Sequence, residues 1–118
     1  MIQLLTNVKI IDNSGGIIGR CIKILQPKNK TIANIGDIIL ISIQKSLRSS
    51  DIKKGELFKA IVVRSSSIYK DAKWSDNGVI LLSSNLTPIG SRIKSGISRE
   101  LSKKKGNKKY LSLAQWIL

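Results

Sequence analysis

Short apolar runs separated by turn-forming residues dominate the first two thirds of the chain. Isoleucine is the main apolar residue, and its β-branched side chain fits a pleated surface. Turn residues fill the intervals, and the polar segment 67–77 is most simply the tip of a hairpin. Five short strands favour a small closed or half-closed β-barrel, because closure removes exposed strand edges. The pattern places these strands at residues 2–11, 17–25, 34–47, 57–67 and 78–84.

The last third of the chain has a different pattern. Proline and glycine favour an ordered loop over a strand in the segment 87–101. Residues 98–106 fit one or two helical turns, because serine stands at the N-cap, lysines come late and glycine stands at the stop. Residues 112–118 fit a second short helix or a docked tail. We therefore expect one domain, with the barrel over about 1–85 and a loop with short helices over about 86–118.

The net charge of the chain indicates the kind of partner that it binds. The chain has 21 Lys and Arg residues against 7 Asp and Glu, which gives a formal net charge of +14. Both halves of the chain carry the excess, so it is not confined to a tail. Such a protein repels itself unless it binds a polyanion, so nucleic acid is the first expected partner and an anionic membrane surface the second. No apolar stretch approaches the roughly 18 residues of a membrane span, and the first residues resemble neither a signal peptide nor a transit peptide.

A run of turn-forming residues, DNSGG at 12–16, follows the first expected strand. It fits a plain hairpin turn in which Gly15 and Gly16 supply positions of positive φ. It equally fits a loop whose backbone N–H groups and short polar side chains bind an anion. We expect Asp12 to face the protein and hold the turn, because a carboxylate is repelled by a polyanion.

Enzymatic chemistry has little support in this sequence. The chain lacks histidine, which excludes Ser-His-Asp and Cys-His arrangements. Cys21 is the only cysteine and lies in an isoleucine-rich strand, so we expect a buried and inert thiol. The seven carboxylates are scattered and fit turns or caps, which leaves an all-carboxylate active site as a distant alternative. The residues indicate no cofactor and no metal site.

Many of the basic side chains stand in expected loops, among serine, asparagine and glycine. This mixture suits contact with a phosphate backbone. Aromatic residues make up only 4% of the chain, which argues against reading single-stranded bases by stacking. The sequence therefore favours recognition of a folded RNA through its shape and phosphates. The basic residues expected to contact RNA are Arg20, Arg48, Lys53, Lys54, Arg64, Arg92, Lys94, Arg99, Lys103, Lys104, Lys105, Lys108 and Lys109.

Nine segments resemble, in the same order, the family of ribosomal protein L14 of the large subunit in its bacterial and organellar form. They are MIQ, DNSGG, CIKIL, GDIILISI, IKKGELFKAIVVR, NGVILLSSN, PIGSRI, SREL and LSLA. The resemblance implies a five-stranded β-barrel with short C-terminal helices and a structural role. It also implies binding to large-subunit rRNA, a bridge to small-subunit rRNA, and contacts with ribosomal protein L19 and a ribosome-silencing factor. By motif match it implies RNA contacts by Asn13, Ser14, Lys53, Lys54, Arg64, Arg92 and Arg99.

Some segments depart from the family pattern. The loop after IVVR is short and poor in arginine, Ser95-Gly96 replaces the usual Gly-Pro, and the ending AQWIL diverges. These departures weaken the expectation of RNA contacts in that loop and of the usual docking to protein neighbours.

The amino-acid composition indicates the cellular compartment in which the protein is made. Heavy use of Ile, Lys, Asn and Ser, with Lys about three times as frequent as Arg, is typical of AT-rich coding. With a family-like start that lacks a transit peptide, this favours a mitochondrial ribosome, with a plastid or an AT-rich bacterium as alternatives. The rival function is a free-standing RNA-binding β-barrel, such as an RNA chaperone or a translation factor.

Overall fold

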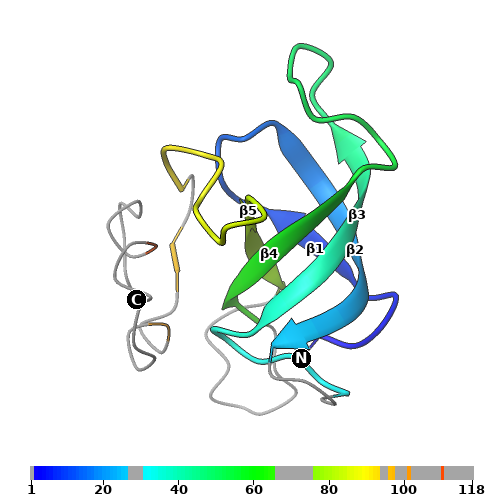
Figure 1. The fold of residues 1–118 in the computed structure, drawn as a ribbon, viewed down its shortest axis with the longest axis vertical. Coiled ribbons are helices and arrows are strands. Elements are labelled where there is room, and N and C mark those ends of the chain that lie inside the picture. Colours follow the sequence, from blue (N-terminus) through cyan, green and yellow to red (C-terminus); the bar gives the residue numbers. More distant parts are fainter. Residues whose placement is uncertain are drawn as a thin grey trace.

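The chain folds into a closed barrel of five strands (Figure 1). A computed structural model describes residues 2–26, 31–65, 76–93, 96–97, 101 and 110. Consecutive strands pair antiparallel, and parallel pairing of the first strand with the fifth closes the barrel. The strands are β1 (Asn7–Ile10), β2 (Gly16–Gln26), β3 (Ile38–Ser46), β4 (Leu57–Arg64) and β5 (Gly78–Leu82).

The barrel interior is aliphatic. In β1, Val8 and Ile10 are buried while their neighbours Asn7 and Lys9 are exposed, which is the alternation of a strand with one face toward a core. Cys21 is fully buried in the same interior cluster. Burial raises the pKa of its thiol above the ordinary value, so the thiol stays protonated and unreactive. The expectation of a buried thiol is confirmed.

A second apolar cluster lies on the outer face of β4 and β5. Ile61 and Ile80 belong to it, whereas their neighbours in the strands point into the barrel. Ile93 and Ile97 cover this outer face and are themselves 1% and 0% exposed. Strands buried on both faces have nearly continuous apolar sequences, which explains the unbroken runs in these two strands. The described residues Ile93 and Ile97 therefore pack on the barrel wall and are part of the core.

The predicted five strands and the barrel are confirmed, but β1 and β3 begin later than predicted, and β4 and β5 end earlier, at Arg64 and Leu82. β1 begins at Asn7 because residues 3–6 form a turn closed by a 3.2 Å hydrogen bond from the Thr6 N–H to the Gln3 carbonyl. β3 begins at Ile38 because the Asp37 carboxylate accepts the Asn34 N–H at 2.8 Å and holds residues 34–37 in a turn.

The predicted hairpin between the last two strands is confirmed by the antiparallel pairing of β4 with β5, although residues 66–75 of its tip lie outside the described residues. The predicted helices also lie outside them, apart from Leu101. In the described part of the chain, no helix is long and apolar enough to cross a membrane.

Candidate nucleic-acid interface

Three loops meet at one end of the barrel, the upper end in Figure 1. They are the β1–β2 turn (11–15), the β3–β4 loop (47–56) and the segment after β5 (83–93). The turn contacts both other loops: the Leu47 N–H donates to the Gly15 carbonyl at 2.9 Å, and the Asn13 N–H donates to the Arg92 carbonyl at 3.1 Å. We call these three segments the loop end.

Asp12 anchors the turn to the barrel. Its side chain is buried, and one carboxylate oxygen accepts the Ser14 N–H at 3.2 Å and the Ser14 hydroxyl at 2.5 Å. The other oxygen accepts the Leu81 N–H at 3.0 Å. Pairing between β1 and β5 stops at Ile10 and Val79, so the carboxylate satisfies a strand N–H that β1 does not reach. Asp12 faces the protein and holds the turn, as the sequence predicted.

Asn13 joins the turn to the segment after β5. Its Oδ1 accepts the backbone N–H groups of Ser91 at 2.8 Å and Arg92 at 3.1 Å. Its Nδ2 donates to the Ser91 hydroxyl at 2.9 Å, which leaves one amide hydrogen for another acceptor. A Cβ at Gly90 would lie 2.7 Å from the Asn13 Oδ1, so this contact needs a glycine there. Asn13 therefore fixes the backbone that carries Arg92.

Gly15 brings the turn against the β3–β4 loop. Its φ is +112°, and a Cβ at this position would lie 2.3 Å from the Ser50 Cβ. Only glycine meets both conditions at low cost. The prediction of two positive-φ glycines is half right: Gly16 begins β2 and lacks a positive φ.

Four of the basic residues predicted to contact RNA are exposed at the loop end. Lys53 and Lys54 stand in a tight turn in which the Lys53 N–H donates to the Glu56 carboxylate at 2.9 Å. Arg48 precedes this turn in the β3–β4 loop. Arg92 stands in the segment after β5, and the β1–β2 turn contacts both of these segments. Within the described residues, none of these four cations makes an ion pair. The loop end thus presents cations on loops that are tied to one another through backbone hydrogen bonds.

Ser14, Arg20 and Arg64 have other partners in the structure. Ser14 is half-buried and gives its hydroxyl proton to Asp12. Arg20 is exposed on the barrel wall, where its Nε donates to the Asn7 side chain at 3.2 Å. Arg64 is only 5% exposed, and its guanidinium pairs with Asp76 at 3.0 Å. The RNA contacts predicted for these three residues stay predictions. The burial of Arg64 does not support an RNA contact by its side chain.

The remaining predicted contacts lie outside the described residues. More than half of the Lys and Arg residues of the chain lie outside the described residues. The predicted contacts among them are Lys94, Arg99, Lys103, Lys104, Lys105, Lys108 and Lys109.

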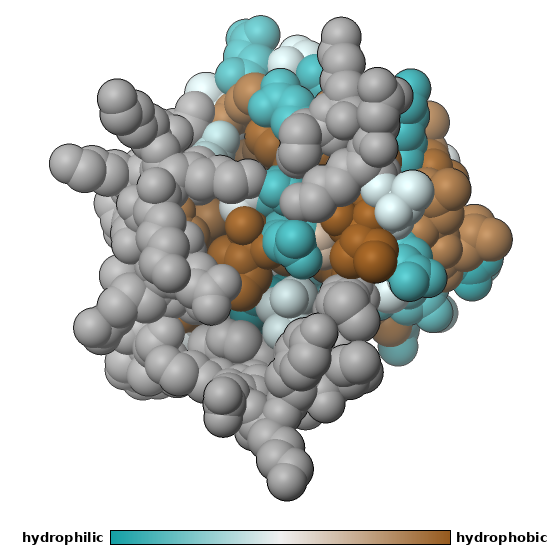
Figure 2. Space-filling model, turned by 90° about the horizontal axis from the view of Figure 1, so that it is seen from below, coloured by the Kyte–Doolittle hydropathy of each residue, from teal (hydrophilic) through white to brown (hydrophobic). Residues whose placement is uncertain are grey.

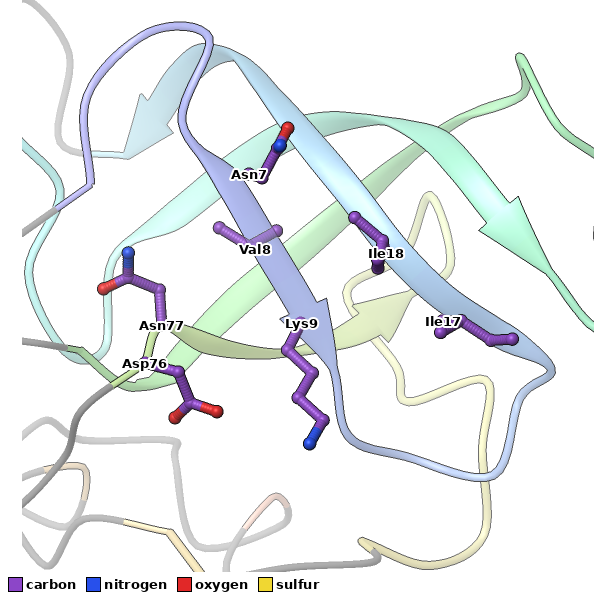
Figure 3. Close-up of a pocket in the computed structure, with 7 residues that line it drawn as sticks. All are labelled: Asn7, Val8, Lys9, Ile17, Ile18, Asp76 and Asn77. Atoms are coloured by element: carbon purple, nitrogen blue, oxygen red, sulfur yellow. The ribbon is translucent and has the colours of Figure 1, made fainter.

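A shallow pocket of about 390 Å³ lies on the outer wall of β1 and β2, beside the start of β5 (Figure 3). Half-buried Ile17 and Ile18 line it together with Lys9, Asp76 and Asn77. Lys9 is an exposed cation that the sequence analysis did not single out, although the alternation of Val8, Lys9 and Ile10 marks it as outward-facing. Seen from below, the described surface mixes hydrophilic and hydrophobic groups rather than separating them (Figure 2).

The described residues offer no centre for metal chemistry. No group of three or more His, Cys, Asp or Glu side chains in that part of the chain could hold a metal ion. The loop end carries cations and hydrogen-bond donors on loops, which suit binding to an anionic surface, together with the carboxylates of Asp51 and Glu56.

Comparison of the sequence with known protein families identifies its family. The model of ribosomal protein L14p/L23e matches residues 1–118, the whole chain. The chain belongs to this family. It is therefore a ribosomal protein of the large subunit, in a family whose members are typically structural rather than enzymatic. The family membership places the barrel in a ribosome.

Proposed function

We propose that this L14-family protein binds large-subunit rRNA through the loop end of its barrel. The observation that carries the proposal is the joining of three loops, by the hydrogen bonds of Asn13 and Gly15, into one surface that exposes Arg48, Lys53, Lys54 and Arg92. Cations on pre-ordered loops bind phosphates without a further cost of ordering the backbone.

Acidic groups at the loop end limit the electrostatic contribution. Asp51 is exposed and Glu56 is half-buried, so the described surface there is only moderately positive. The binding we propose therefore depends on the arrangement of individual cations against phosphates rather than on a broad positive field. The predicted RNA contacts by Asn13, Ser14, Arg20, Lys94, Arg99 and the C-terminal lysines are proposed on sequence grounds alone.

We further propose that the protein lies at the subunit interface. The family resemblance supports a bridge to small-subunit rRNA, a contact with ribosomal protein L19 and binding of a ribosome-silencing factor. The divergent ending AQWIL makes the protein contacts the least supported of these. Composition supports a mitochondrial ribosome over a plastid or bacterial one.

Sedimentation of the tagged chain tests assembly into the large subunit. We expect it to migrate with large subunits on a density gradient and to remain there after a wash at moderate salt. A free-standing RNA-binding barrel would stay at the top of the gradient while large subunits ran below, and that result would contradict the proposal. Detection of the chain in large subunits purified from mitochondria, from plastids or from bacterial cells would then identify the compartment.

A further inference from the structure

Arg64, at the end of β4, packs over a glycine of the neighbouring strand β5. It pairs across the sheet with Gly78 of β5. A Cβ at Gly78 would lie 2.7 Å from both the Cγ and the Nε of Arg64. The arginine side chain therefore runs directly over the glycine, and the missing side chain at Gly78 leaves the space in which the guanidinium is buried.

The guanidinium joins two segments that are far apart in sequence. Nη2 donates to the Asp76 carboxylate at 3.0 Å, at the base of the β4–β5 hairpin. Nη1 donates to the Gly96 carbonyl at 3.3 Å. The planar fork of arginine can serve a carboxylate and a carbonyl at once, which a lysine ammonium does less well. Figure 3 shows Asp76 beside Asn77, immediately before β5.

Gly96 lies near the end of the segment 91–97, and Asn13 holds the beginning of that segment. Asn13 binds the backbone at Ser91 and Arg92, and the side chains of Ile93 and Ile97 are buried against the outer face of β4 and β5. The backbone on either side of Ile93 is thus held at two points, while the side chain of Arg92 stays exposed.

We infer that Arg64 is a positioning residue, which fixes the Gly96 end of this segment on the barrel so that Arg92 meets RNA in one conformation. The inference rests on the proposed rRNA binding. An unpinned segment must be ordered when RNA binds, which costs affinity but removes no phosphate contact. Loss of the arginine should therefore weaken binding roughly tenfold with the salt dependence unchanged. A direct phosphate contact by Arg64 would instead lower the salt slope by about one unit.

Asp76→Asn separates the two roles most sharply. This substitution makes the protein more positive, so electrostatics alone predicts tighter binding to an rRNA transcript. It also weakens the interaction of Arg64 with residue 76, because the ion pair becomes a hydrogen bond to a neutral amide. The positioning role therefore predicts weaker binding to the transcript. Gly78→Ala makes the same distinction sterically, because it displaces the arginine without removing its charge. Tighter or unchanged binding by both variants would overturn the inference.

Two further measurements complete the test. In an Arg64→Ala background, Gly78→Ala should add little, because the atoms that it would meet are gone. Arg48→Met removes an exposed cation as a control, and it should lower the salt slope and leave hydrogen exchange of residues 91–97 unchanged. All affinities are measured well below the melting temperature, so that a loss of global stability alone does not affect them.

Hydrogen exchange keeps the inference testable apart from RNA. Exchange in residues 91–97 should be faster in Asp76→Asn and Gly78→Ala, while exchange in the β2–β3 pair stays slow. If the wild-type chain fails to bind rRNA, the proposed function fails, and faster exchange still supports the positioning of the segment. Unchanged exchange in both variants would overturn the positioning role whatever the RNA result.

Discussion

The Oδ1 of Asn13 accepts the backbone N–H of Arg92 at 3.1 Å, although the two residues are separated by most of the chain. Through this bond and the one at Ser91, the β1–β2 turn supports the segment after β5, which carries Arg92. A residue that the family resemblance marks as an RNA contact thus has a structural duty first, with one amide hydrogen left for RNA.

Asn13→Ala should destabilise the protein by about 1–2 kcal/mol, because it removes the acceptor of two backbone N–H groups and a donor to Ser91. Asn13→Asp keeps the acceptor oxygen, so most of the stability should remain. Urea denaturation measures both free energies of unfolding. Equal losses in the two variants would show that the backbone bonds to Asn13 contribute little.

Gly15→Ala and Gly55→Ala form a matched pair. Both glycines have positive φ, at +112° and +91°, so alanine costs about 1–2 kcal/mol in backbone strain at either site. Only at Gly15 would the new Cβ also meet Ser50, whereas nothing lies within 4 Å at Gly55. The free energy of unfolding should therefore fall further in Gly15→Ala, by roughly another 1–3 kcal/mol. Similar losses would argue against close packing of the turn on the β3–β4 loop.

Changing Lys53 and Lys54 together to Ala should reduce the salt dependence of rRNA binding. Each lost phosphate contact lowers the slope of log K against log salt by about one unit, so the expected change is about two. Filter binding at several salt concentrations measures the slope. The double variant Lys23→Ala, Lys45→Ala removes two exposed lysines from β2 and β3 and is the control. An unchanged slope in the Lys53 and Lys54 variant would remove these residues from the interface.

Cys21 should resist thiol reagents in the folded protein and react on unfolding, because it is fully buried in the barrel and its pKa is raised by burial. The raised pKa means that the unfolded chain loses this proton first as the pH rises above 9.0. The contribution of the thiol to stability is therefore complete below that pH and decreases above it. The difference in unfolding free energy between wild type and Cys21→Ala should shrink above this pH. Rapid labelling of the native protein by a thiol reagent would contradict the burial.

The sequence predicted the features that depend on local pattern. Alternating and continuous apolar runs located the strands. The isoleucine-rich surroundings of Cys21 correctly predicted its burial, and the repulsion between a carboxylate and a polyanion correctly predicted that Asp12 faces the protein. The sequence did not predict the burial of Arg64, because an arginine at a strand end usually faces solvent. That position depends on Gly78 and Gly96, which are distant in sequence. The bonds of Asn13 to the Arg92 segment were invisible for the same reason.

A density map of the large subunit containing this chain tests the central claim most directly. The account predicts that the loop end faces rRNA, with the side-chain nitrogens of Lys53, Lys54 and Arg92 at hydrogen-bonding distance from phosphate oxygens. It also predicts that Arg64 stays over Gly78 and paired with Asp76. A map in which the loop end faces solvent or another protein, while another face of the barrel contacts the RNA, would contradict it.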